Sequence, residues 1–250
     1  MKDIYASTRA EWARIWEEET NLERELKTLD YRRARYARAL YHPFLPRDGL
    51  ILEGGCGLGI EVINLESQGC KVVGVDYAVN ALVQLNRYKP GYRLAAGDVH
   101  HLPFREGAFG AYLSIGVLEH FDFGPAPGLH EAHRVLRPDG ILVLIIPYPN
   151  LVWRLVQLKK RLARPKLRPP AFYETTYTTG QLRQHLAAAD FEVLAQHPIG
   201  HSFTLWGVSR LFRGPGYYET SAVAERLGDI FSKLLPWSMC FESLIIARKS

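Results

Sequence analysis

A glycine-rich segment at residues 53–59 constrains the fold more than any other part of this 250-residue chain. It reads Glu-Gly-Gly-Cys-Gly-Leu-Gly, follows an apolar run at 50–53, and precedes a helical pattern from Leu58 to about Gln68. Alternating glycines let a backbone turn tightly and approach a ligand closely. The helix that follows offers unpaired N–H groups in its first turn. The segment therefore predicts a strand, a ligand-binding turn and a helix, in that order.

The same succession of strand and helix repeats along the chain. The continuous apolar run ILVLII at 141–146 is typical of a strand covered on both faces. Alternating strands and helices form a mostly parallel sheet with helices on both faces. We therefore expect an α/β, Rossmann-like fold with strands at 50–53, 71–76, 92–96, 109–116, 141–146, 191–196 and 240–248, helices at 78–87, 129–136 and 179–189, a turn at 137–140, and Thr179 as a helix cap.

The residues before the glycine-rich segment have a different pattern. Apolar side chains recur at helical spacing over residues 8–41, and prolines follow them, which predicts a continuous helix there. We expect an N-terminal helical cap at 1–46 and a single domain at 47–250. A basic, lid-like insert at 150–178 interrupts the alternation, and its residues 154–168 hold seven basic side chains and no acidic one.

The composition is that of an ordinary globular protein, with 47% hydrophobic and 23% charged residues. The three cysteines are widely spaced, which argues against a disulfide framework. The first twenty residues lack the apolar core of a secretory signal. We therefore expect a cytoplasmic protein. The formal net charge of +5 makes the chain mildly basic but identifies no partner.

Two acidic residues stand at the ends of predicted strands. Asp76 ends the second strand, and Asp98 follows the third. Parallel strands end at one edge of the sheet, where doubly wound folds bind ligands, and a carboxylate there can accept both hydroxyls of a ribose. Ile60 stands where a dinucleotide fingerprint has its third glycine, so a nicotinamide or flavin dinucleotide fits this loop less well.

Five segments in this order, ILEGGCGLG, VVGVD, GDVHHLPF, FGAYLSIGVLEHF and AHRVLRPDGILVLIIP, resemble the motifs of class I S-adenosylmethionine-dependent methyltransferases. The resemblance covers about residues 50–147 and is strongest to the small-molecule group that includes ubiquinone- and menaquinone-type enzymes. It implies a seven-stranded sheet with an antiparallel last strand, and S-adenosylmethionine as the cofactor. It also implies the cofactor-binding residues, which are Gly55, Gly57 and Gly59 along the methionine moiety with Cys56 in the same loop, Glu53 near its amino group, Asp76 with Tyr77 at the ribose, Asp98 and Val99 at the adenine, and Ser114 and Ile115 at the methionine end.

An acceptor that must lose a proton requires a general base. Glu119 and His120, just past the fourth strand, are the best-placed pair, and histidine titrates near neutral pH. The alternative is a structural element of the loop, because Leu-Glu-His is widespread in the family that the motifs resemble. Tyr148 is expected at the same edge, and Tyr5 and Trp12 on the cap could close over the cofactor; a pocket wall and a packed core are the alternatives. The histidines lack metal-ligand spacing, so we expect no metal.

The acceptor class follows less directly from the residues. Enzymes that methylate amines of nucleic-acid bases commonly carry a D/N-P-P-Y motif after the fourth strand, where this chain reads Ser114-Ile115-Gly116-Val117, so nucleic acid is the less favoured acceptor. We expect O-methylation of a small or lipid- or sugar-linked molecule. C-methylation of a quinone-like ring, methylation of RNA, and a catalytically silent cofactor-binding protein remain the alternatives.

Residues 151–168 combine apolar positions at helical spacing with basic residues and Trp153. A basic amphipathic helix with an aromatic side chain can lie in the headgroup layer of an anionic membrane. The segment therefore suggests peripheral contact with the inner face of a membrane. A lid helix over the substrate cleft, with its charges merely solvated, is the favoured alternative.

Overall fold

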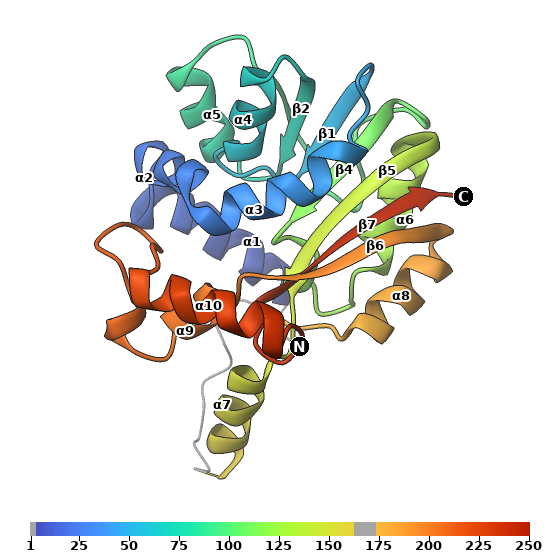
Figure 1. Ribbon diagram of the computed structural model, residues 1–250. Coiled ribbons are helices and arrows are strands. Elements are labelled where there is room, and N and C mark those ends of the chain that lie inside the picture. The colour runs from blue at the N-terminus through green and yellow to red at the C-terminus, as the bar shows by residue number, and fades with distance from the viewer. Residues whose placement is uncertain (1–3, 163–173) are drawn as a thin grey trace.

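A seven-stranded sheet forms the centre of the computed structural model, which describes residues 4–162 and 174–250 (Figure 1). The strand order is β3-β2-β1-β4-β5-β7-β6. β7 runs antiparallel to both of its neighbours, and the other pairs of adjacent strands are parallel. The predicted Rossmann-like sheet with an antiparallel last strand is therefore confirmed. The strands are β1 Leu50–Gly54, β2 Lys71–Asp76, β3 Arg93–Ala96, β4 Phe109–Ile115, β5 Leu136–Pro147, β6 Phe191–Ile199 and β7 Glu242–Lys249.

Helices cover both faces of this sheet, as the apolar runs of the central strands require. One buried cluster joins the sheet to α6 and α8, and a second joins the opposite face to α3 and α4. The α-helices are α1 Ile4–Arg14, α2 Leu22–Leu26, α3 Arg32–Tyr41, α4 Ile60–Ser67, α5 Val79–Tyr88, α6 Ala126–Val135, α7 Leu151–Leu162, α8 Thr179–Ala188, α9 His201–Trp206 and α10 Ala222–Leu234. Shorter helical turns are η1 Ile15–Glu19, η2 Lys27–Asp30, η3 His42–Phe44, η4 Leu118–His120 and η5 Arg210–Phe212.

The N-terminal region is broken into several helices, so the continuous helix predicted over residues 8–41 is wrong. The backbone is extended at Thr20 (φ −136°, ψ 172°) and again at Tyr31 (φ −64°, ψ 137°). The Asn21 side chain accepts a hydrogen bond from the backbone N–H of Arg24 and so begins a new helix. Helical periodicity continues through such a break because the apolar spacing on either side is unchanged.

Two local boundaries also differ from the sequence-based prediction. Residues 137–140, expected as a turn, lie within β5, where the pairing with β4 shifts register between Phe109 and Ala111 and Asp139 has a φ of 59°. The turn is thus absorbed as a bulge in the strand. The cap of α8 is Thr178 rather than Thr179, because Gln181 completes a capping box with Thr178.

The segment between β6 and β7 was not assigned any element from the sequence, and it contains α9 and α10. Ala224 on α10 packs with Leu205 on α9 and with Met239 in a small cluster of their own. This helical pair lies beside the edge of the sheet formed by β6 (Figure 1). It extends the molecule on the side where β5 and β6 end and β7 begins.

The cap packs against α5 through backbone carbonyls. The Asn80 side chain donates to the carbonyl of Ala13 at 2.7 Å, and the Gln84 side chain donates to the carbonyl of Trp16 at 2.6 Å.

The helix α7 projects away from the sheet (Figure 1). The division into a cap at 1–46, a domain at 47–250 and an insert at 150–178 remains a proposal.

Candidate active site

The glycine loop turns between β1 and α4 with three left-handed residues. Gly55, Gly57 and Gly59 have φ values of 71°, 50° and 69°. A Cβ on Gly57 would lie 2.7 Å from the ring of Trp16, and one on Gly59 would collide with Leu85. Only glycine combines these backbone angles with such close neighbours. The loop is therefore closely packed on both sides, and Trp16 of the cap lies directly over it.

Glu53 lies at the end of β1 and is 6% exposed. One carboxylate oxygen accepts a hydrogen bond from the backbone N–H of Val62 at 3.0 Å, which ties β1 to the first turn of α4. Burial raises the pKa of Glu53 well above its usual value, and the negative charges of Glu61 and Asp76 add to this effect. The role expected for Glu53 near an amino group remains a proposal.

Asp76 lies at the end of β2 and connects the glycine loop to the next helix. Its two carboxylate oxygens accept hydrogen bonds from the backbone N–H of Gly57 at 2.8 Å and of Ala78 at 2.7 Å. Burial raises its pKa, and these backbone N–H groups oppose the rise. Each carboxylate oxygen has a second lone pair, so Asp76 can still accept hydroxyl groups from a ribose.

The residues after β2 and β3 lie at the same edge of the sheet. Arg9 of the cap lies over the ring of Tyr77, with its guanidinium carbon 5.2 Å from the ring centre. Asp98 accepts a hydrogen bond from the backbone N–H of His100 at 2.9 Å. Val99 is 3% exposed and belongs to the core, so its backbone is the part available for a ligand.

Cys56 and Ser114 have side chains that are buried on opposite faces of the sheet. Cys56 packs in the core with α4, and burial raises the pKa of its thiol well above the usual value. Ser114 is fully buried, and its hydroxyl has no hydrogen-bond partner among the described residues. Ile115 ends β4 and is partly buried against the α3–α4 side. Cys56 is thus a core residue, and any contact that it makes with a cofactor would come from its backbone.

Glu119 and His120 are both buried in η4, just past the end of β4, and are 3% and 8% exposed. The Nε2 atom of His120 lies 3.9 Å from one oxygen of Glu119. The His120 ring meets the ring of Trp12 edge-on at 5.1 Å between centres. The cap therefore reaches this position through Trp12. Closure of Trp12 over the cofactor stays a prediction, and the side chain of Tyr5 lies outside the described residues.

Three charged residues on the acceptor side were missed by sequence reasoning: Glu174 and Glu242, which act on Glu119, and Arg33, which acts on Glu242. They are Arg33 on α3, Glu174 before α8, and Glu242 at the start of β7. Burial raises the pKa of Glu119 well above its usual value, and repulsion from Glu174 and Glu242 adds to it. Glu242 could have been identified from the sequence, because an acidic residue at the start of the apolar strand 242–249 is unusual. Arg33 lies in a helix with many charged residues and Glu174 in a basic insert, so neither residue stands out from its neighbours in the sequence.

Tyr148, expected at this edge, follows β5 and lies 5.3 Å from Trp237 between ring centres. Its backbone N–H donates to the carbonyl of Phe241 at 2.9 Å, which holds the end of β5 against the chain entering β7.

Within 4–162 and 174–250, histidine, cysteine and carboxylate side chains form no group of three suited to a metal ion. The expectation that no metal is needed stays a prediction.

Comparison with known proteins finds similarity to methyltransferases over the central part of the chain. Residues 52–144 match the family model described as a methyltransferase domain. The demethylmenaquinone methyltransferase of Beutenbergia cavernae is 34% identical over 96 residues, which cover 38% of this chain and 39% of that protein. A probable tRNA methyltransferase 9B of Mus musculus is 32% identical over 123 residues, covering 48% of this chain and 25% of that protein. The chain spans less than half the length of these curated relatives.

Solved structures extend the similarity to the whole fold. The 1,6-didemethyltoxoflavin-N1-methyltransferase of Burkholderia thailandensis, solved with 1,6-didemethyltoxoflavin and S-adenosylhomocysteine bound, superposes with a TM-score of 0.61. That superposition covers 98% of this chain and 88% of the other, at 20% sequence identity. At this identity the likeness shows the fold alone.

Proposed function

Because the chain carries a class I S-adenosylmethionine-dependent methyltransferase domain, we propose that it transfers a methyl group from this cofactor to a hydroxyl of a small or lipid- or sugar-linked molecule. The observation that carries the proposal is the order of polar groups along one sheet edge. Glu53 and Asp76 lie at the ends of β1 and β2, Asp98 follows β3, and the buried Glu119–His120 pair follows β4. A cofactor side and an acceptor side are thus adjacent.

The residues present fit the cofactor. Asp76 is buried at the end of β2, and each of its carboxylate oxygens keeps a lone pair beyond the hydrogen bonds from Gly57 and Ala78. We assign the methionine moiety to the glycine loop and Glu53, the ribose to Asp76 and Tyr77, and the adenine to Asp98 and Val99. When bound, S-adenosylmethionine supplies an electrophilic methyl carbon on a sulfonium. The chain's own task is to hold the acceptor oxygen in line with that carbon and to remove its proton.

His120 is the proposed base for that proton. Its ring is 8% exposed and held between the cap and the loop, so water has little access to it. Burial keeps the neighbouring Glu119 protonated at a higher pH than usual, so the carboxyl is the weaker candidate for a base in the empty site. A quinone-like ring, which loses a proton from carbon, would need the same group, and C-methylation is therefore the second candidate.

RNA methylation and a silent cofactor-binding role remain the further candidates. The probable tRNA methyltransferase is the observation that keeps the first of them open. Binding to RNA that falls steeply as salt rises would support it. Cofactor binding without turnover over any acceptor would support the second.

Replacement of Asp76 by alanine should weaken S-adenosylmethionine binding, because it removes two charge-assisted hydrogen bonds worth roughly 1.5–3 kcal/mol each. It also frees the backbone N–H groups of Gly57 and Ala78, so the loop loses its support. Isothermal calorimetry measures the effect, with the exposed Asp48→Ala as the matched control. Wild-type protein that binds NAD but gives no heat with S-adenosylmethionine would contradict the proposal.

The helix α7 is proposed to contact an anionic membrane from the cytoplasmic side. Its Trp153, Leu155 and Leu158 are 39%, 57% and 53% exposed, and Arg154 and Lys159 lie on the same helix. Val152 packs against the α9–α10 cluster and so attaches α7 to the rest of the protein. The basic residues 160, 161 and 164 lie outside the part whose side chains are described. In residues 4–162 and 174–250, no helix is long and apolar enough to cross a membrane.

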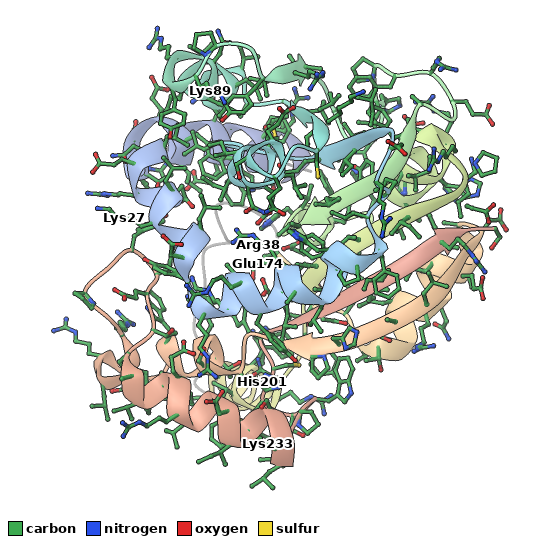
Figure 2. All side chains as sticks on the ribbon, turned by 45° about the horizontal axis from the view of Figure 1, so that its top comes forward. Lys27, Arg38, Lys89, Glu174, His201 and Lys233 are labelled. Atoms are coloured by element: carbon green, nitrogen blue, oxygen red, sulfur yellow. The ribbon has the colours of Figure 1, made fainter. Side chains whose placement is uncertain are left out.

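The protein should co-sediment with vesicles containing anionic lipid, and binding should weaken as salt rises. Neutral vesicles should leave it in the supernatant. Lys159→Glu should reduce the bound fraction more than Lys89→Glu, whose site on the loop after α5 is far from α7 (Figures 1 and 2). Protein that stays in the supernatant with anionic vesicles at low salt would instead favour the lid alternative.

A further inference from the structure

Three carboxylates converge where β4, β5 and β7 reach the ligand edge of the sheet. The backbone N–H of Thr175 donates to the carbonyl of Glu119 at 3.0 Å, which places Glu174 beside the loop after β4. The backbone N–H of Tyr177 donates to the carbonyl of Pro147, and Pro147 pairs with Glu242 across β5 and β7. Figure 2 shows Glu174 near the middle of the molecule. We call Glu119, Glu174 and Glu242 the carboxylate cluster.

One guanidinium faces this cluster from the cap. Arg33 lies over the ring of Phe203, with its guanidinium carbon 4.5 Å from the ring centre. Phe203 is on α9, which begins directly after Gly200, and a Cβ on Gly200 would lie 3.7 Å from an oxygen of Glu242. With all groups ionised, three negative charges lie near one positive charge. Glu119 is buried, Glu242 and Arg33 are partly buried, and Glu174 is exposed.

Two polar atoms here have no hydrogen-bond partner among the described residues. One is the Oε2 atom of Glu119, a side chain that is 97% buried, and the other is the buried Nη1 atom of Arg33. A buried polar atom without a partner costs free energy. The Oε2 atom of Glu119 can accept a hydrogen bond from a donor or a cation, and the Nη1 atom of Arg33 can donate to an acceptor. A ligand with a cationic donor beside a neutral oxygen or nitrogen acceptor would provide a partner for both atoms.

Electrostatics in the empty site agree with this geometry. Burial raises the pKa of Glu242 to about 7, with Arg33 lowering it and Glu174 raising it. Burial likewise raises the pKa of Glu174 and lowers that of Arg33. An ammonium group among these carboxylates would favour their ionised forms, so its binding would release protons.

The cluster lies on the acceptor side of the edge, beside the glycine loop and not within it. Gly55 follows β1 and Asp76 ends β2, whereas Glu119 follows β4, the strand next to β1, and Glu242 begins β7 farther along the sheet. We propose that the methyl acceptor carries a protonated amine and that the carboxylate cluster recognises it, with Arg33 holding an oxygen or nitrogen of the same molecule. The inference rests on the proposed function, because it takes this edge as the acceptor site.

The test uses full-length protein saturated with S-adenosylhomocysteine and three probes of equal size, benzylamine, benzyl alcohol and benzoate. Ligand-observed NMR titration at pH 7.5 should show benzylamine binding about tenfold or more tightly than the other two. Glu242→Gln and Glu119→Gln keep the shape of each side chain and remove its charge, so each should abolish most of this preference. The control is Glu192→Gln on β6, because Glu192 is exposed and pairs with Arg248 of β7. This variant should keep the preference for benzylamine.

Proton release on binding gives a second measurement. It would be absent if the carboxylates only supported the local structure. Calorimetry of benzylamine binding in buffers of different ionisation enthalpy should detect release at pH 7.5, and Glu242→Gln should reduce it. Equal binding of the three probes, or no binding of benzylamine, would overturn the inference. A second result would also overturn it. If Glu242→Gln or Glu119→Gln keeps the preference for benzylamine but binds S-adenosylmethionine less tightly than S-adenosylhomocysteine, the carboxylate cluster binds the positive sulfonium of the cofactor and not an amine of the acceptor. Failure of S-adenosylhomocysteine itself to bind would instead count against the proposed function.

Discussion

Replacement of Arg38 by methionine should lower the free energy of unfolding by about 3–5 kcal/mol, because it leaves a buried carboxylate without its partner. Arg38 on α3 donates to Glu61 on α4 through Nε at 2.8 Å and through Nη2 at 2.6 Å. The two side chains are only 10% and 12% exposed. Arg38 also donates to the carbonyl of Leu29 at 2.7 Å. One side chain thus joins two turns of the cap to the first helix of the domain.

Chemical denaturation monitored by circular dichroism measures this loss. The matched control is Arg93→Met, because the Arg93–Glu66 pair has a similar 2.7 Å distance but its arginine is 49% exposed. An exposed pair is worth less than about 1 kcal/mol. If the two variants lose equal stability, burial of the Arg38 pair is not what stabilises the cap.

A double variant separates the pair from its surroundings. Arg38→Met with Glu61→Gln removes both charges, so it should be more stable than Arg38→Met alone. Recovery will be incomplete, since Tyr41 also donates to Glu61 at 3.0 Å and Leu29 loses its donor. Additive losses in the two single variants would show that the ion pair makes no coupled contribution.

The sheet was predictable from sequence because its elements carry local signals. Strands such as β2 and β5 are runs of branched apolar residues, and each is bounded by glycine, proline or an acid. Burial on both faces of a parallel strand leaves this mark in the sequence itself. The glycine loop was predictable for the same reason, since its glycines all lie within residues 54–59.

The cap and the acceptor side depend on contacts between distant residues. The break at Thr20 lies between the contact of Trp16 with α5 and the Asn21 cap, and at the break at Tyr31 the tyrosine hydroxyl donates to the carbonyl of Tyr217. The apolar spacing does not report these contacts. Glu119 and Glu242 are far apart in sequence and meet because β7 returns antiparallel beside β5. No spacing rule connects Arg33 with either of them. The sequence therefore identifies the fold and the cofactor more directly than it identifies the acceptor.

The largest functional effect is expected at His120. If it removes the acceptor proton, His120→Ala should lower turnover by about 10²–10⁴-fold and leave cofactor affinity unchanged. The ring is placed for this task by its contact with Trp12 and by burial beside Glu119 at the end of β4. The readout is transfer of labelled methyl groups from S-adenosylmethionine to an acceptor found in a panel of hydroxyl- and amine-bearing compounds.

Two comparisons distinguish catalysis by His120 from support of the loop. His130→Ala changes an exposed histidine on α6 and should leave turnover and stability near wild type. Calorimetry with S-adenosylhomocysteine and thermal unfolding of His120→Ala should both match wild type, because His120 is not among the residues proposed to bind the cofactor. A variant that retains full turnover would assign His120 to loop structure. A variant that loses stability and cofactor affinity together with turnover would do the same, since a base acts on the proton alone.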